Sequence, residues 1–150
     1  MDQEYKEDEV FKIIGRMKAN EIKKKEPINM LQDIFVEQSK LNARIGAFGI
    51  NWLENGTADI ASLSEEQRNE ALRRFITEIW LETAELQEDI SHKWWKNQSS
   101  DIEHAREEAI DILHFLVSVM QLLGMSAEDV YNVYMKKSQV NHDRQAAQGN

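Results

Sequence analysis

The sequence contains no cysteine, a single proline and only six glycines in 150 residues. Without cysteine, the chain has neither a disulfide scaffold nor a thiolate metal site. No apolar run reaches the roughly 18 residues of a membrane-spanning helix, and no signal peptide heads the chain, so we expect a cytoplasmic protein that binds no membrane. The alternation of apolar and polar residues that is typical of strands is also absent, which favours an all-α protein.

Basic residues are in the minority. The chain has 18 lysines and arginines against 27 aspartates and glutamates, for a net charge of −9. This charge argues against broad binding of nucleic acid, whereas a nucleotide could still be bound through a metal ion and a few local cations. The sequence also lacks a P-loop, a GxGxxG motif and any arrangement of a serine or cysteine nucleophile.

The length and the hydrophobic share of 41% predict a single domain with a substantial core. We expect residues 1–26 to form an N-terminal helical extension and residues 27–150 to form the main domain. The helices predicted for the main domain are 27–45, 64–95, 100–124 and 127–145, with one long loop at 46–63. The predicted fold class is therefore all-α, a four-helix-type bundle with an additional N-terminal helix.

Local signals support these boundaries. Capping boxes are predicted at Ser64-x-x-Gln67 and Ser100-x-x-Glu103, and Ser126 is predicted to cap the last helix. Trp52 is expected to pin the long loop to the core. The residues predicted to form the buried side of the first helix of the main domain are Met30, Leu31, Ile34, Leu41 and Ile45.

Two pairs of acids occupy helical spacings that core leucines normally take. Glu82-x-x-Glu85 and Glu108-x-x-Asp111 each place two carboxylates on one helix face. The segment that follows Asp111 is apolar on nearly every side, so we expect that helix to be buried. Because an unpaired buried carboxylate is costly, the second pair needs basic partners or a cation. A solvated acidic face with capping residues is the alternative interpretation.

Four carboxylates between two helices would form a hard-oxygen site for Mg²⁺, with Mn²⁺ possible. Such a site favours metal-assisted phosphoryl transfer or hydrolysis. Three Asp-x-x-His pairs, beginning at Asp89, Asp101 and Asp111, suggest a di-iron carboxylate protein as a weaker alternative. We interpret His114 as a core histidine that is hydrogen-bonded within the bundle.

Several further segments are similar to one family. They are Gln38-x-Lys40-Leu41-Asn42, Asn51-Trp52, Asn55-Gly56, Lys93-x-Trp95-Lys96, Asp111-x-x-His114-Phe115, residues 124–131, and Lys136, Lys137, Asn141, Arg144 and Gln145. Together with the two acid pairs, they resemble the all-α (MazG-like) nucleoside triphosphate pyrophosphatases. The most similar branches are the dimeric dUTPases and the phage dCTP/dUTP pyrophosphatases, and the resemblance covers roughly residues 28–145.

The resemblance implies a site and a reaction. Glu82, Glu85, Glu108 and Asp111 would hold Mg²⁺, and a water activated by a carboxylate, with Glu82 and Glu85 as the catalytic acids, would attack the α-phosphorus and release pyrophosphate. The residues expected to neutralise phosphate charge are Lys93, Lys96, Lys137 and Arg144. Those expected to contact base and sugar are Gln38, Asn42, Trp95 and Asn141.

The implied substrate is a deoxynucleoside triphosphate, with dUTP first and dCTP, or both, as the alternative. The implied assembly is a homo-oligomer, a dimer or a dimer of dimers. His92 stands where both branches carry tryptophan, and the chain lacks the C-terminal tail of the longer dUTPases, so the base pocket is expected to differ. A non-catalytic helical binding module on the same scaffold is the alternative of another class.

Overall fold

The computed structural model describes residues 29–90 and 93–149. The predicted N-terminal helix at 1–26, Pro27 and His92 lie outside the described residues, and so does the proposed boundary between extension and main domain. Within the described residues the helices are α2 (Met30–Arg44), α3 (Glu65–Asp89), α4 (Ile102–Leu122) and α5 (Ala127–Gln148), with short 3₁₀ turns η1 (Ala47–Gly49) and η2 (Ile60–Ser62). The all-α class is confirmed, since this part of the chain has no strand apart from an isolated bridge between Trp52 and Ala58.

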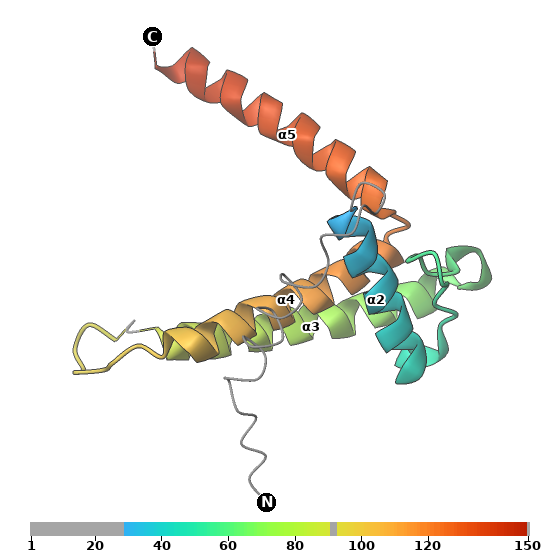
Figure 1. Cartoon of the computed structure of the whole chain (residues 1–150), viewed down its shortest axis with the longest axis horizontal. Coiled ribbons are helices and arrows are strands. Elements are labelled where there is room, and N and C mark those ends of the chain that lie inside the picture. Colours follow the sequence, from blue (N-terminus) through green and yellow to red (C-terminus); the bar gives the residue numbers. More distant parts are fainter. Residues whose placement is uncertain (1–28, 91–92, 150) are drawn as a thin grey trace, which may run out of the picture.

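Helices α3 and α4 form a long antiparallel hairpin, and α2 lies across one end of it (Figure 1). Helix α5 meets the other helices only near its first turn, where it contacts α2, and then projects away from them. Among the described helices, no single one has the length and hydropathy of a membrane span. Helices α4 and α5, which are bent by 101° relative to each other, would together meet these two criteria by length and composition alone.

The helix starts follow local capping chemistry, with one correction. The box at Ser64 and Gln67 is present, and Ser126 caps α5 in a second box with Asp129. Helix α4, however, is capped by Asp101, whose side chain accepts from the backbone N–H of His104 at 3.1 Å, and not by Ser100. A carboxylate at this position satisfies one free N–H and also suits the positive end of the helix dipole.

The end of α3 was also predicted wrongly. The helix stops at Asp89, six residues before Trp95, and Ile90 is extended. The backbone N–H of Asp101 donates to the carbonyl of Asp89 at 2.7 Å and so closes the base of the hairpin. This hydrogen bond gives a partner to one carbonyl in the last turn of α3. Because the donor lies on the other side of the hairpin turn, no local sequence signal predicts it.

The core has its centre where the 46–63 loop meets the hairpin. Trp52 is buried, donates its ring N–H to the carbonyl of Ala47 at 3.2 Å, and packs edge-on against Phe75. The prediction for Trp52 is therefore confirmed. Gly56 has a φ of +85°, and a Cβ there would lie within 2.9 Å of the α2 backbone, so only glycine lets the loop pack this closely.

The predicted buried face of α2 is wrong. Leu31 is half-buried, but the other four apolar residues of that face are exposed: Met30, Ile34, Leu41 and Ile45. The residues that are buried instead are Phe35, Gln38, Ser39 and Asn42. Three of these are polar, and they can be buried because α4 and the loop provide hydrogen-bonding partners for them.

Helix α4 is buried along one side only, which corrects the expectation of burial all round. Val117, Ser118, Gln121 and Leu122 are buried, whereas Ile110, Leu113 and Leu116 are exposed. Helices α2 and α3 cover two sides of α4, and a third apolar side is covered by no other described helix.

Candidate active site

Three of the four predicted acids meet in the middle of the hairpin. The helical spacing puts Glu108 and Asp111 on one face of α4, and Glu82 faces them from α3. Ligand oxygens of Glu82, Glu108 and Asp111 all lie within 4.8 Å of one another. Glu85 is exposed one turn further along α3, outside this group, although its charge still acts on Glu82.

The cluster is electrostatically strained. Glu108 is only 5% exposed, and with the acids ionised its Oε2 finds no hydrogen-bond donor among the described residues. A hydrogen bond to Glu108, partial burial, and the charges of Glu108, Glu85 and Asp111 together raise the pKa of Glu82 to about 7. Between pH 4.5 and about 7, the cluster therefore retains a proton, whereas isolated glutamates would be ionised. The reason is that like charges at this spacing repel.

These features fit a divalent cation. The donors are all carboxylate oxygens, which Mg²⁺ and Mn²⁺ prefer, and a bound cation would supply the partner that Oε2 of Glu108 lacks. A structural role alone does not explain the cluster, because a purely structural seam between two helices is more stable when filled by apolar side chains.

Two residues beside the cluster were not predicted as site residues. Nδ1 of His104 lies 2.6 Å from Oδ2 of Asp89, and Nε2 lies 3.2 Å from Oε1 of Glu108. The hydrogen bond to Asp89, followed by the charges of Asp89 and Glu108, raises the pKa of His104 against the opposing effect of desolvation. The signal that could have found this contact was the i,i+4 spacing of His104 and Glu108, whereas the predicted partner Asp101 caps the helix instead.

A groove of about 550 Å³ runs beside the acids, between α2 and α4. Gln38 and His114 line it, and Nδ1 of His114 lies 2.6 Å from Oε1 of Gln38. His114 is one turn from Asp111 on the same helix, so one wall of the groove is a helical turn away from that carboxylate. His114 was predicted to be a core histidine that is hydrogen-bonded within the bundle. The hydrogen bond is present, but the placement in the core is wrong, because His114 is exposed in the groove.

Asn42 lies deeper than Gln38. Its amide accepts from Nε2 of Gln38 at 3.0 Å and donates to Oγ of Ser118 at 2.9 Å, and it is 2% exposed. Gln38 therefore reaches the groove, whereas Asn42 supports it from behind.

Three residues predicted to contact substrate lie in the turn between α3 and α4, namely Lys93, Trp95 and Lys96. Lys93 is paired with Glu88 at 3.0 Å, and the rings of Trp94 and Trp95 meet edge-on with centroids 5.7 Å apart. Trp95 and Lys96 are exposed. This turn is the end of the hairpin away from α2 (Figure 1), and it follows Asp89, the last residue of α3.

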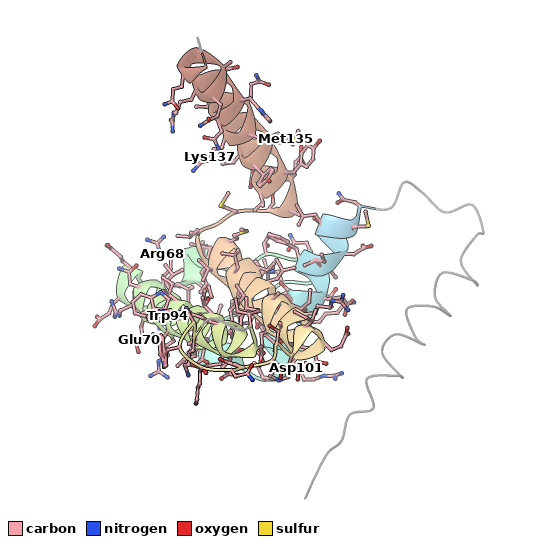
Figure 2. The ribbon with its side chains drawn as sticks, turned by 90° about the vertical axis from the view of Figure 1, so that its left-hand side faces the viewer. Arg68, Glu70, Trp94, Asp101, Met135 and Lys137 are labelled. Atoms are coloured by element: carbon pink, nitrogen blue, oxygen red, sulfur yellow. The ribbon has the colours of Figure 1, made fainter. Side chains whose placement is uncertain are left out.

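The residues predicted on the last helix do not reach the acids within one chain. Lys137, Asn141 and Arg144 are all exposed on the projecting part of α5. Figure 2 shows Lys137 and Met135 on this helix, well separated from Trp94 and Asp101 at the hairpin end. A single chain thus brings together Glu82, Glu108 and Asp111, and it places Gln38 with His114 in the groove, but it does not bring the α5 residues to either.

Comparison with known proteins agrees with this geometry. A family model described as dUTPase matches residues 30–121, which run from the start of α2 almost to the end of α4 and include all four predicted acids. The chain belongs to this dUTPase family. It is also 25% identical, over 141 residues that cover 81% of each chain, to a protein named dCTP pyrophosphatase from Enterobacteria phage T4. No solved structure matches the chain significantly.

Membership of the family makes the protein an enzyme of the nucleoside triphosphate pyrophosphatase type. The family match ends before α5 begins, so the projecting helix lies outside the matched segment.

Proposed function

We propose that the enzyme hydrolyses dUTP to dUMP and pyrophosphate with the help of Mg²⁺. The observation that carries this proposal is the carboxylate cluster of Glu82, Glu108 and Asp111, in which a buried oxygen of Glu108 finds no donor in the described part of the chain. The description of the matched family as dUTPase supports uracil as the base. Because deoxynucleoside triphosphates are made and used inside cells, we place the enzyme in the cytoplasm.

Glu82, Glu85, Glu108 and Asp111 would hold Mg²⁺, or Mn²⁺ in its place. When bound, the cation would neutralise charge on the triphosphate oxygens and on the transition state. Glu82 and Glu85 are proposed to take the proton of the attacking water, since they come from the same face of α3 and Glu82 already lies against the cluster. Bond cleavage between the α- and β-phosphates releases pyrophosphate.

The groove between α2 and α4 is the proposed base site. Gln38 presents an amide there, which can both donate and accept and so suits a pyrimidine edge. Asn42 holds Gln38 in place through their 3.0 Å hydrogen bond. Lys93, Trp95 and Lys96 form the proposed phosphate and base contacts at the hairpin end.

Lys137, Asn141 and Arg144 are proposed to act in an oligomer, most simply a dimer. In the single chain they lie on the projecting α5, which also exposes Tyr131, Tyr134 and Val140. Apolar side chains of α2 and α4 are exposed as well, among them Leu41, Ile110 and Leu113. A second copy could cover these faces and bring α5 to the acids.

Oligomeric state is measured by light scattering at high micromolar concentration. Ile110→Glu should convert a dimer to a monomer and lower activity, because a charge would be buried in the interface. Exposed Glu107→Gln on the same helix is the control. A wild-type monomer would contradict the proposed assembly.

A preference for dCTP is the second candidate, because a relative that covers 81% of the chain carries the name dCTP pyrophosphatase. The base site itself favours neither pyrimidine, since the amide of Gln38 can present either a donor or an acceptor.

The deciding experiment measures pyrophosphate release from dUTP, dCTP, dTTP, dATP and dGTP, with Mg²⁺ and with EDTA. We expect Mg²⁺-dependent turnover with dUTP the best substrate. A higher kcat/KM for dCTP would establish the second candidate, and no turnover with any substrate would favour a non-catalytic binding module. Visible absorbance and bound iron in the purified protein would instead indicate a di-iron protein.

Two variants of α5 separate base contacts from phosphate contacts. Asn141→Asp removes amide donors and should reorder the preference among bases by about tenfold to a hundredfold. Arg144→Ala should weaken all triphosphates by similar factors, because phosphates are common to them. If Arg144→Ala discriminates among bases and Asn141→Asp does not, the two roles are reversed.

A further inference from the structure

His104 bridges two carboxylates with opposite sides of its ring. Nδ1 faces Oδ2 of Asp89 at 2.6 Å, and Nε2 faces Oε1 of Glu108 at 3.2 Å. Because each nitrogen lies against a different acid, turning either nitrogen to a cation would break one of these two contacts. The ring therefore joins Asp89 to Glu108, which suits it to hold Glu108 in place.

Two described side chains lie against the carboxylate of Glu108. Glu82 forms a hydrogen bond with it, and Nε2 of His104 lies 3.2 Å from Oε1 of a side chain that is 6% exposed. With Oε1 engaged by His104, the unpaired Oε2 is the atom left to bind a cation. A carboxylate that is fixed through one oxygen loses less rotamer freedom when the other oxygen binds a metal.

Asp89 is itself fixed by the fold. It is the last residue of α3, and its carbonyl accepts from the backbone N–H of Asp101, which is the N-cap of α4. His104 lies one turn into α4, so the closure of the hairpin sets the distance between Asp89 and the histidine ring. The i,i+4 spacing then sets the distance from the ring to Glu108.

We propose that His104, oriented by Asp89, is a positioning residue that presents Glu108 to the divalent cation of the active site. This inference rests on the proposed metal-dependent function. Hydrogen bonds from outside the ligand set orient metal-binding side chains, and their loss commonly weakens metal affinity by about 10- to 100-fold.

The test measures Mn²⁺ affinity of the full chain, by the electron paramagnetic resonance signal of free Mn²⁺, so the readout is independent of catalysis. His104→Leu should weaken binding about tenfold or more. His104→Gln should stay within about threefold of wild type, because a glutamine amide at i,i+4 can still donate to Glu108. The matched control is His142→Leu, which removes an exposed histidine on α5.

Circular dichroism melts show which variants are folded. A folded His104→Leu variant with wild-type Mn²⁺ affinity, alongside a Glu108→Gln variant that has lost it, would overturn the positioning role and leave the proposed function standing. If the leucine variant does not fold, Asp89→Ala carries the test, and unchanged affinity there overturns the role. If wild-type protein binds no Mn²⁺ at all, the proposed function fails and the positioning role fails with it.

Discussion

Two polar clusters lie between helices of this protein, and they are built in opposite ways. Between α2 and α4, Gln38, Asn42 and Ser118 form an unbroken chain of neutral hydrogen bonds, and Nε2 of Gln121 reaches the carbonyls of Phe35 and Gly56. Between α3 and α4, Glu82, Glu108 and Asp111 repel one another, and one oxygen of Glu108 has no hydrogen-bond donor within residues 29–90 and 93–149.

The difference separates a structural cluster from a functional one. Neutral amides are largely satisfied by their neighbours, so the first cluster stabilises one arrangement of α2 on α4. Its exception, Oε1 of Gln121, is a neutral carbonyl oxygen, whose burial costs less than that of a charged carboxylate. The acids form a cluster that the fold alone does not stabilise, which is expected of residues kept for binding a cation.

The largest expected effect is on catalysis. Glu108→Gln should lower kcat/KM by about 100-fold or more, since a metal ligand contributes several kcal/mol to the transition state. The same change should leave the metal-free protein equally stable or more stable, because it removes a buried like charge. Activity with Mg²⁺ and thermal melts in EDTA check both parts.

The adjacent and exposed Glu107→Gln provides a matched control and should change neither quantity. Alanine at each of Glu82, Glu85, Glu108 and Asp111 extends the test. Near wild-type activity at saturating Mg²⁺ in two of these variants would show that the acids are not the metal site.

The next effect is on stability. Gln121→Ala should lower the free energy of unfolding by about 2–4 kcal/mol, because two buried backbone carbonyls lose their donor and a cavity is left. Urea denaturation measures this change. The exposed Gln87→Ala on α3 is the control, and equal stability of the two variants would mean that the neutral cluster does not hold α2 in place.

A smaller effect concerns pH. The pKa of Glu82 is raised from 4.5 to about 7, so between these values the folded, metal-free protein binds a proton that the unfolded chain releases. The stability that this proton provides is fully present below pH 4.5 and is lost as pH rises through about 7. The raised pKa of His104 acts in the same direction.

We therefore expect the melting temperature in EDTA to fall between pH 5 and about pH 7.5. Glu82→Gln should make the fall shallower, and saturating Mg²⁺ should do the same because the cation replaces the proton. A wild-type profile that rises over this range in EDTA would contradict the described carboxylate cluster.

The smallest expected effect is that of Gln38→Ala on substrate preference and stability. Gln38 belongs to the neutral cluster and also lines the groove beside the acids. Gln38→Ala should change the ratio of kcat/KM for dUTP and dCTP by about tenfold and lower stability by about 1 kcal/mol. Lys40→Ala, an exposed neighbour on α2, should change neither, and a loss of stability with an unchanged ratio would make Gln38 purely structural.

Much of the site was predictable because helical spacing is strongly constrained. The three-residue spacings within Glu82-x-x-Glu85 and Glu108-x-x-Asp111 identify these acids as candidates. Their contact across the hairpin follows from the antiparallel packing of the two helices. The role of His104 was missed because its partner Asp89 lies on the other helix, 15 residues away in sequence.

The sequence by itself determined the all-α class, the capping box at Ser64, the cap at Ser126, the anchoring of Trp52 and the helical spacing within each acid pair. Each of these depends on contacts within a few residues or on one helical period. Only the tertiary structure decided that α3 ends at Asp89, that α2 buries Gln38 and Asn42 while Ile34 and Leu41 stay exposed, and that α5 leaves the other helices. Periodicity shows which residues share a face, but the element that packs there decides whether that face is buried.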